Sequence, residues 1–360
     1  MLLENVRLAN FRNYASLEVE PAPGLNIFAG PNAQGKSNLL EAVAMLATGK
    51  SFRARRESEL VRCGEQLAEI GGDARIAAGR VRLRCTVDTG AGGTRKHFDV
   101  NGAAVGFARF LGKARVVTFV PADLALVGGG PALRRSFMNA ALAQASPLYY
   151  RDLALYGKII VQKAALLRGA IAPDRDLLLA YNDELVQPGN ALMSARAAFI
   201  AEIGAATAAI YGRWRATSEG LGVRYVPSAG EGSLERALAA NVENELRRRQ
   251  ALIGPHRDDL RLEIDGQSLA AYGSQGQQRT AVLALKVAEY EVMRQRAGDA
   301  PILLLDDVLS ELDAGRAGGF LAAVGSFEQA FLTTTELPAG LDVGVTAFAI
   351  RQGRVTRSAC

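Results

Sequence analysis

The segment GPNAQGKS at residues 30–37 limits the possible folds of this chain more than any other feature of its sequence. It satisfies the pattern G-x-x-x-x-G-K-[ST], whose glycines let successive backbone N–H groups turn inward around phosphate oxygens. An apolar segment, Gly24–Ala29, precedes it, and apolar residues at helical spacing continue to Gly49. A glycine-rich turn before an ordinary helix is the competing interpretation. The full pattern in this context predicts a P-loop, and therefore a nucleotide site in an α/β protein.

A P-loop assigns a role to each of its residues. Lys36 is expected to reach the β- and γ-phosphates, and the Ser37 hydroxyl is expected to bind Mg²⁺. The helix that begins near Lys36 directs its positive end at the same phosphate charge. The expected contacts of the triphosphate are Gly30, Pro31, Asn32, Ala33, Gln34, Gly35, Lys36 and Ser37.

Two acids end another informative segment, ILLLDD at residues 302–307. A buried strand that ends in carboxylates is where a P-loop protein places its second contact to Mg²⁺. We therefore expect Asp306 to hold the metal ion and Asp307 to orient or deprotonate the attacking water. A strand that simply runs into an acidic turn is the alternative when this segment is considered alone.

A second helix start suited to an anion lies in YGSQGQQRT, where Ser274 stands between Gly273 and Gly276. The chain thus has two phosphate-binding helix starts but one pair of metal-binding acids. A second subunit is the simplest way to use both, so the sequence predicts a nucleotide site shared between two copies.

The order of patterns along the chain predicts its domains. Strand and helix patterns alternate near both ends, and 270 positions separate Lys36 from Asp306. Toward the C-terminus we expect the strand Ile302–Asp306, a helix around 314–324, and closing strands near Gln329–Thr334 and Val345–Arg351. We predict a discontinuous α/β domain formed by residues 1–125 and 250–360, with antiparallel strands at about 66–120. Residues 126–249 are rich in alanine and leucine at helical spacing, and they predict a helical lobe with a short antiparallel helical arm. Its helices are expected to be separated by Pro131, Pro147, Pro173 and Pro188.

Composition favours a cytoplasmic location. The longest uncharged stretches have 15 residues, whereas a bilayer-spanning helix needs about 20 apolar residues. Cys63, Cys85 and Cys360 form no spaced cluster, which fits a reducing compartment and disfavours a zinc site. Lysine and arginine together number 42 against 37 acids, and this excess fits either a phosphate-binding surface or a bias of the genome.

Several segments together resemble the RecF family of bacterial recombination mediators, within the wider class of ABC-type ATPases. The segments are NFRNY at 10–14, GPNAQGKS, PADLALVGGGPALRR at 121–135, IGPHRDDL at 253–260, GSQGQQR, and LLLDDVLSELD with SELD at 310–313. The resemblance extends from residue 2 to about 335. It implies a P-loop ABC-type ATPase head with mixed sheets, which binds ATP and Mg²⁺ and forms an ATP-dependent homodimer on DNA.

The resemblance also implies a pathway and further site residues. Such a protein acts in repair at single-strand gaps, together with RecO and RecR, and helps to load the recombinase RecA. Ser274, Gly276 and Gln277 would cap the γ-phosphate held by the partner subunit. Arg12 and Asn13 would lie at the edge of the nucleoside.

Two departures from the wider ABC pattern predict slow ATP hydrolysis that serves as a switch. Thr333, Thr334 and Thr335 stand where a histidine is usual, and no glutamine precedes Pro121. In addition, Asp307 takes the place of the usual glutamate, although this agrees with the RecF pattern. We therefore expect nucleotide binding to be retained while turnover is weak.

Clusters of arginine are candidate contacts for the DNA backbone, whose binding is electrostatic. They comprise Arg53, Arg55 and Arg56 after the P-loop helix, Arg80, Arg82 and Arg84 on one strand face, and Arg247–Arg249 at a helix end. Each cluster is also typical of a solvated loop, strand or helix terminus. No aromatic residues are interleaved with them, so the pattern favours backbone contacts over base stacking.

Two other functions would use the same ATP motifs. One is the nucleotide-binding subunit of an ABC transporter, which predicts a helical insertion that docks on membrane segments and a histidine for rapid turnover. The other is a structural head of the SMC type, which needs a coiled-coil arm of hundreds of residues. The missing histidine disfavours the first, and an insertion of about 120 residues disfavours the second.

Overall fold

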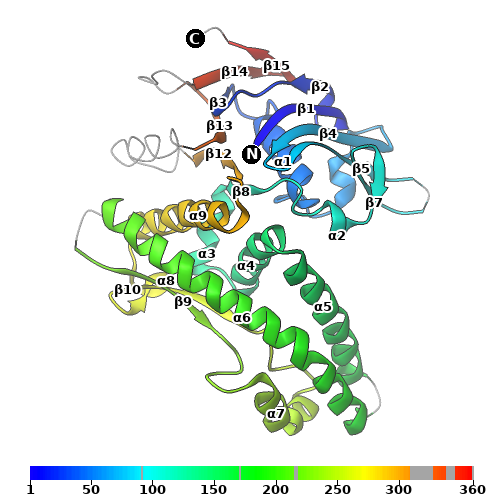
Figure 1. Cartoon of the computed structure of the whole chain (residues 1–360), viewed down its shortest axis with the longest axis vertical. Coiled ribbons are helices and arrows are strands. Elements are labelled where there is room, and N and C mark those ends of the chain that lie inside the picture. Colours follow the sequence, from blue (N-terminus) through cyan, green and yellow to red (C-terminus); the bar gives the residue numbers. More distant parts are fainter. Residues whose placement is uncertain (91, 170–171, 215–217, 309–326, 338–344, 359–360) are drawn as a thin grey trace. The chain divides into compact units, whose positions relative to one another are not determined.

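The computed structural model describes residues 1–360 except 91, 170–171, 215–217, 309–326, 338–344 and 359–360 (Figure 1). It divides into two compact units, residues 1–123 with 289–360 (unit 1) and residues 124–288 (unit 2). The expected boundary differs at residues 250–288, which belong to unit 2. The reason is strand pairing, because β10 (Asp259–Ile264) lies antiparallel to β9 (Leu221–Val226).

A mixed sheet in unit 1 carries the segments with phosphate and metal motifs. Its strands follow the order β15-β14-β3-β13-β12-β8, and all the pairs are parallel except that of β14 with β15. Their bounds are β3 Gly24–Ala29, β8 Val116–Phe119, β12 Ile302–Asp306, β13 Gln329–Thr334, β14 Val345–Arg351 and β15 Arg354–Arg357. Since the carboxyl ends of parallel strands meet at one edge, β3 and β12 bring the P-loop and the acidic pair together, with β13 between them.

The second sheet of unit 1 is antiparallel, with the order β2-β1-β4-β5-β6-β7. Its strands are β1 Leu2–Phe11, β2 Tyr14–Val19, β4 Leu67–Ile76, β5 Gly79–Asp88, β6 Arg95–Val100 and β7 Ala103–Val105. The antiparallel run expected over 66–120 therefore ends at Val105. The segment Val116–Phe119 instead pairs in parallel with β12, because its apolar side chains suit a strand covered on both faces.

Helix α1 (Lys36–Thr48) forms the centre of the unit 1 core. Its apolar residues are buried among those of both sheets, and Gly49 ends it in the left-handed conformation, as the sequence predicted. Across the parallel sheet, the ring of Phe28 stacks on Phe348 and Phe331, with centroids 4.8 and 5.8 Å away. This packing fixes β3, and with it the entry into the P-loop.

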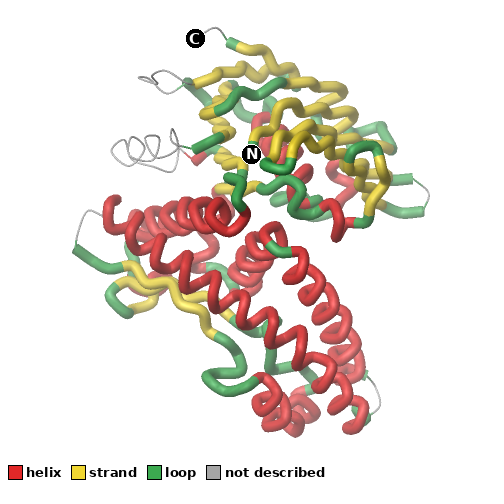
Figure 2. The backbone as a smooth tube through the Cα atoms, viewed as in Figure 1, coloured by secondary structure: helices red, strands yellow, loops and turns green. Residues whose placement is uncertain are grey.

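Unit 2 is mainly helical, with a small sheet of order β11-β10-β9 (Figure 2). Its helices are α3 Ala125–Gly128, α4 Pro131–Ala145, α5 Pro147–Arg168, α6 Arg175–Trp214, α7 Leu234–Arg248 and α8 Leu269–Tyr272, and β11 is Gln267–Ser268. Helix α9 (Gln275–Ala297) contains the boundary between the units at residue 288. The remaining elements of the described residues are η1 Glu57–Leu60, α2 Phe107–Phe110 and η2 Pro121–Leu124.

Helices α5 and α6 form the predicted antiparallel hairpin, but one of the expected breaks is wrong. Pro131 and Pro147 begin α4 and α5, whereas Pro188 lies buried inside the 40-residue α6. At the next position a side chain on Gly189 would overlap Leu234. Close packing against the start of α7 therefore holds α6 together at a residue that would end an isolated helix.

By length and apolar composition, α6 is also the one described helix that could cross a membrane. Core helices of globular proteins meet the same criterion. Here the buried side of α6 carries Asn182, Arg196 and Thr207 along with its apolar residues. Buried polar groups at this spacing indicate a helix that packs within a protein lobe.

The segment IGPHRDDL holds unit 2 together through a buried ion pair. The guanidinium of Arg196, which is 2% exposed, donates to the carbonyl of Pro255 at 2.7 Å and lies 3.3 Å from the carboxylate of Asp258. The same carboxylate accepts from the Ser228 N–H at 2.7 Å and from the Tyr225 hydroxyl. Because buried charges are tolerated only when paired, this segment has a structural role.

Candidate nucleotide-binding site

The loop between β3 and α1 has the glycines that its geometry requires. A side chain on Gly30 would overlap the carbonyl oxygen of Ile350 on the neighbouring strand β14. Gly35 has φ +113°, a backbone conformation that other residues rarely adopt, and a side chain there would lie 2.7 Å from the Asn13 amide. The pattern G-x-x-x-x-G therefore reflects close packing around the loop as well as room for phosphate oxygens.

Neighbouring elements hold the loop on two sides through Gln34. Its carbonyl accepts from the Asn13 side chain at 3.0 Å and from the Gly353 N–H at 3.2 Å. Its side-chain oxygen accepts from the Gln352 N–H at 2.6 Å. Asn13, expected at the nucleoside, is thus also a support of the loop, and the β14–β15 turn is a support that the sequence reasoning missed.

Pro31, Asn32 and Ala33 form the exposed crest of the loop, and Ala33 has φ 64°. Consecutive residues in turn conformations can direct their N–H groups to one side. Helix α1 begins after Gly35, which has no side chain to cap the first turn. Pro31 has no N–H, so the N–H groups from Asn32 to the first turn of α1 are the ones suited to an anion.

Lys36 lies over this loop and close to both acids. It is 8% exposed, and its ammonium donates to the carbonyls of Gly30 at 2.5 Å and Pro31 at 2.8 Å. Burial lowers the pKa of Lys36, whereas the charges of Asp307 and Asp306 act to raise it. The ammonium is thus a positive charge held between the loop and the acidic strand end.

The Ser37 hydroxyl and the Asp306 carboxylate meet although they are far apart in sequence. Ser37 Oγ donates to Asp306 Oδ1 at 2.7 Å, and Asp306 is 8% exposed at the end of β12. Hydroxyl and carboxylate oxygens are the ligand types that Mg²⁺ prefers. The donor set at this point therefore fits the metal ion expected from the sequence.

Asp307 directly follows and has φ 52°, the left-handed region that is uncommon for residues with side chains. Its N–H donates to the Thr333 hydroxyl at 2.9 Å. The carboxylate lies near enough to Lys36 to affect its pKa. Asp307 is therefore at the edge of the site, in the region where the sequence placed the residue that orients water.

Arg12 has a partner that the sequence reasoning missed. Its guanidinium donates to both carboxylate oxygens of Glu41 at 2.7 and 2.9 Å, and to the Glu59 carbonyl at 2.8 Å. Glu41 is fully buried in α1 and also accepts from the Ser51 hydroxyl. The sequence contained a signal for this contact, because Glu41 lies among the apolar residues of the predicted helix. Arg12 thus ties β1 to α1 beside the loop, and its contact with a nucleoside stays a prediction.

Ser274 and Gln277 belong to unit 2, whereas the P-loop and both acids belong to unit 1. At the start of α9, the Ser274 hydroxyl accepts from the Gln277 N–H at 3.2 Å, and the Ser274 N–H donates to the Gln277 side chain at 2.7 Å. This reciprocal pair is a capping box. The predicted helix start is present, and its own side chains satisfy part of it.

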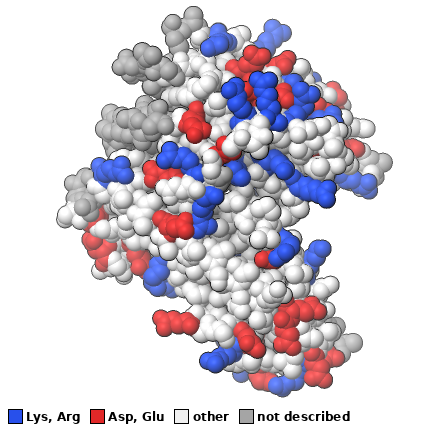
Figure 3. Space-filling model, in the orientation of Figure 1, with Lys and Arg blue, Asp and Glu red and all other residues white. Residues whose placement is uncertain are grey.

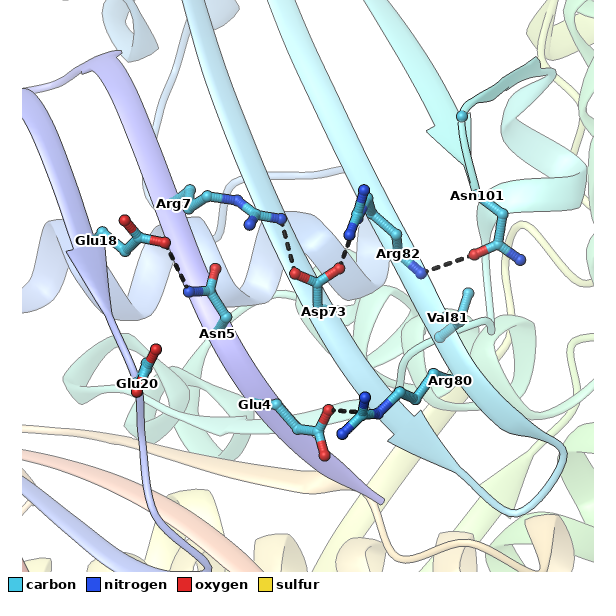
Figure 4. A pocket seen from close by; sticks show the side chains of 11 residues that line it. Glu4, Asn5, Arg7, Glu18, Glu20, Asp73, Arg80, Val81, Arg82 and Asn101 are labelled. Carbon is cyan, nitrogen blue, oxygen red and sulfur yellow. Dashed lines mark hydrogen bonds and ion pairs between the residues drawn. The ribbon is translucent and has the colours of Figure 1, made fainter.

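The arginines of β5 are exposed but paired with acids. Figure 4 shows Arg7 and Arg82 directed at Asp73, both 2.8 Å from it, and Arg80 directed at Glu4, 3.1 Å away. Figure 3 shows the same interleaving of basic and acidic side chains over the antiparallel sheet. This pairing supports the alternative of a solvated strand face over a basic DNA surface.

Some members of the other two arginine clusters also have side-chain partners. Arg53 donates to the Asn38 side chain and lies 3.4 Å from Glu41, and Arg247 donates to Asn244 at 2.5 Å. Arg249 donates to the carbonyl of Gly169 at 2.7 Å. The segment SELD and the helix expected around 314–324 lie outside the described residues.

Comparisons with known proteins agree with this architecture. A family model described as an AAA domain matches residues 5–104. The DNA replication and repair protein RecF of Symbiobacterium thermophilum is 40% identical over 352 residues, covering 94% of this chain and 92% of the relative. RecF of Chloroflexus aurantiacus is 39% identical over 368 residues, covering 94% of each chain.

Solved structures show the same similarity over the full length. A structure of the recombination mediator protein RecF with ATP, in the RecFOR pathway, has a TM-score of 0.89 at 31% identity and covers 99% of this chain and 97% of its own. An Smc head domain from Pyrococcus furiosus has a TM-score of 0.57 at 16% identity, which shows a shared fold. The fold is therefore the predicted mixed α/β ATPase head with a helical lobe, and the chain belongs to the RecF family of DNA replication and repair proteins.

Proposed function

We propose that this protein is an ATP-dependent DNA-binding protein of recombinational repair, in which bound ATP joins two copies around DNA. One observation carries the proposal. The chain brings Ser37 and Asp306 to 2.7 Å across 269 positions of sequence, beside a buried Lys36. This constellation, at the carboxyl edge of a parallel sheet, is suited to a magnesium nucleotide. The relatives that carry the name RecF, one of them solved with ATP, support the same assignment.

Within the proposed site each residue has a distinct task. Residues 30–37 bind the triphosphate through the backbone N–H groups of the loop, to which Pro31 contributes none, and Lys36 neutralises its terminal charge. Ser37 and Asp306 hold Mg²⁺, which when bound offsets the charge on the reacting phosphoryl group. Asp307 orients the attacking water. Arg12 and Asn13 fix the side of the loop nearest to the nucleoside.

The helix start at Ser274 explains how ATP could switch the protein between monomer and dimer. Ser274, Gly276 and Gln277 would cap the γ-phosphate bound by the other subunit, so the triphosphate contacts both subunits only in the closed dimer. A ligand shifts an equilibrium only through such a difference in affinity between the two states. Slow hydrolysis then resets the protein, since ADP lacks the phosphate that bridges them.

DNA and the repair partners complete the proposed function. The dimer would bind DNA at single-strand gaps through backbone contacts, in the cytoplasm, and act with RecR and RecO to help load RecA. The names of the relatives and the RecFOR pathway of the solved structures support this role. The α/β domain would hold the nucleotide, while the helical lobe would supply the second helix start.

The proposal is tested by measuring assembly and DNA binding on the same preparations. Light scattering with ATP and Mg²⁺ should show a dimer, and Ser274→Arg should remain a monomer while binding ATP with unchanged affinity. Gln267→Arg, an exposed position on β11, is the matched control and should still dimerise. A wild-type monomer at saturating ATP would contradict the proposed switch.

Fluorescence anisotropy with gapped DNA should then show binding that is strongest with ATP, weaker with ADP and weakest without nucleotide. The affinity should fall as salt rises, because backbone contacts release counterions. Absence of salt-sensitive DNA binding, with ATP binding retained, would favour the transporter subunit instead.

A further inference from the structure

Strand β13 ends at the centre of the candidate site. It lies between β3, which enters the P-loop, and β12, which ends in the acidic pair. In the parallel register of β12 and β13, Thr333 is the partner of Asp306. Thr333 is fully buried. A side chain at this position is therefore directed by the sheet itself toward the acids.

The hydroxyl of Thr333 contacts both acids in different ways. It donates to Asp306 Oδ1 at 2.8 Å, the same oxygen that accepts from Ser37 at 2.7 Å. It accepts from the backbone N–H of Asp307 at 2.9 Å. The carbonyl of Leu305 is a poorer acceptor for the same hydroxyl, at 3.5 Å. One hydroxyl thus fixes the orientation of one carboxylate and the backbone of the next residue.

The second contact matters because Asp307 has φ 52°. A left-handed conformation at a residue with a side chain has a conformational cost, and the surrounding structure must hold it. The hydrogen bond from its N–H to Thr333 is one such restraint. It determines where the Asp307 side chain leaves the backbone, beside Lys36.

We propose that Thr333 is a positioning residue, which orients Asp306 for the metal ion and holds Asp307 at the angle that water activation requires. The inference rests on the proposed function and assigns Thr333 a role in it. Groups that hydrogen-bond to metal ligands commonly change metal affinity by 10- to 100-fold when they are removed, about the size expected here.

The adjacent Thr334 provides a matched control. It is 8% exposed, lies on the same strand, and its hydroxyl donates to the Glu336 carbonyl at 2.8 Å. Successive side chains of a strand point to opposite faces, so this hydroxyl is directed away from that of Thr333. Replacing either threonine by valine removes one buried hydroxyl at nearly constant volume, but only Thr333→Val removes a contact with the acids.

The experiment titrates Mg²⁺ against binding of a fluorescent ATP analogue, in the wild type, Thr333→Val, Thr333→Ser and Thr334→Val. Thr333→Val should raise the Mg²⁺ concentration for half-maximal binding about tenfold. Its binding of the analogue in EDTA should change less than twofold. Thr333→Ser should restore the wild-type Mg²⁺ requirement, and Thr334→Val should match the wild type.

Equal Mg²⁺ requirements in Thr333→Val and Thr334→Val would overturn the proposal, as would a Thr333→Ser variant as impaired as Thr333→Val. Thermal unfolding checks that each variant folds, and Thr333→Ala replaces Thr333→Val if the valine variant does not. The proposal would also be overturned if Thr333→Val and Thr333→Ala both lost binding of the analogue to a similar extent with and without Mg²⁺. That result would indicate a purely structural role. If the wild type itself binds the analogue without any response to Mg²⁺, the proposed function fails first.

Discussion

The polar site of unit 1 and the polar core of unit 2 each combine a basic side chain with aspartate, but in opposite ways. In unit 2, Arg196 and Asp258 are buried and each has several protein partners. In unit 1, Lys36 donates to two loop carbonyls beside Asp306 and Asp307, at a loop with an exposed crest. A saturated network stabilises a fold, whereas groups that a ligand can reach are suited to binding.

The comparison also explains which motifs of the family are structural. IGPHRDDL is one of the segments that carry the resemblance to the family, alongside GPNAQGKS. In the structure, Asp258 pairs with the buried Arg196 inside unit 2, and Asp259 pairs with Arg134 at 2.7 Å. A distinctive motif can therefore mark a buried charge network, because such a network tolerates little substitution.

The largest expected effect is on the stability of unit 2. Replacing Arg196 by Met should leave the buried Asp258 without its cation and destabilise the protein by about 3–5 kcal/mol. Urea unfolding followed by circular dichroism measures the change. Arg151→Met is the control, since Arg151 is 69% exposed and its ion pair contributes little. A change below about 1 kcal/mol for Arg196→Met would contradict the structural role given to this network.

The same region should be sensitive to acid through His256. Its Nδ1 accepts from the Tyr156 hydroxyl at 2.7 Å when the ring is neutral, and burial lowers the pKa of His256 to about 4. The unfolded chain, with a pKa near 6.5, binds the proton first as the pH falls. The contribution of neutral His256 to the free energy of unfolding is therefore fully present above about pH 6.5. It is lost progressively as the pH falls toward 4, by up to about 3 kcal/mol.

Urea unfolding at a series of pH values measures this slope. His256→Gln should flatten the part of the slope between about pH 6.5 and pH 4, although it lowers stability at neutral pH. His97→Gln, at an exposed position, is the control substitution, and the slope of His256→Gln is compared with it. An identical slope in the wild type and His256→Gln would show that other groups carry the acid sensitivity.

For the polar site of unit 1, we expect a substitution to affect ligand binding more than stability. Asp306→Asn removes the charge that we propose binds the metal ion but keeps the shape of the side chain, so the free energy of unfolding should change by no more than about 1 kcal/mol. Binding of ATP with Mg²⁺ should weaken at least tenfold, about 1.4 kcal/mol. Isothermal titration calorimetry measures the affinity. If the variant bound the magnesium nucleotide with normal affinity, Asp306 would not be a ligand of the metal ion.

The smallest effect concerns the start of α9. Ser274→Ala removes the hydroxyl that accepts from the Gln277 N–H, which should lower stability by about 1 kcal/mol. Ser233→Ala, at the start of α7, is a matched control with the same type of cap and no proposed role in binding. If both variants lose the same stability but only Ser274→Ala impairs ATP-induced dimerisation, the second helix start has a function beyond capping.

The sequence alone determined the elements whose signals are local. The P-loop, the strands Ile302–Asp306, Gln329–Thr334 and Val345–Arg351, and the limits of α1 follow from glycine positions and short apolar runs, and the structure has them at the predicted residues. These signals lie within a few residues of the feature that they predict. The candidate nucleotide site could be proposed from the sequence for the same reason, because most of its residues lie in two short segments.

Tertiary structure alone decided which distant side chains share a partner. The contacts of Arg12 with Glu41 and of Thr333 with Asp306 join separate elements, and so does the pairing of the β5 arginines with Asp73 and Glu4. It also placed β8 in the parallel sheet and residues 250–288 with the helical lobe. None of these follows from periodicity, because a periodic pattern shows which face of an element is buried but not which element covers it.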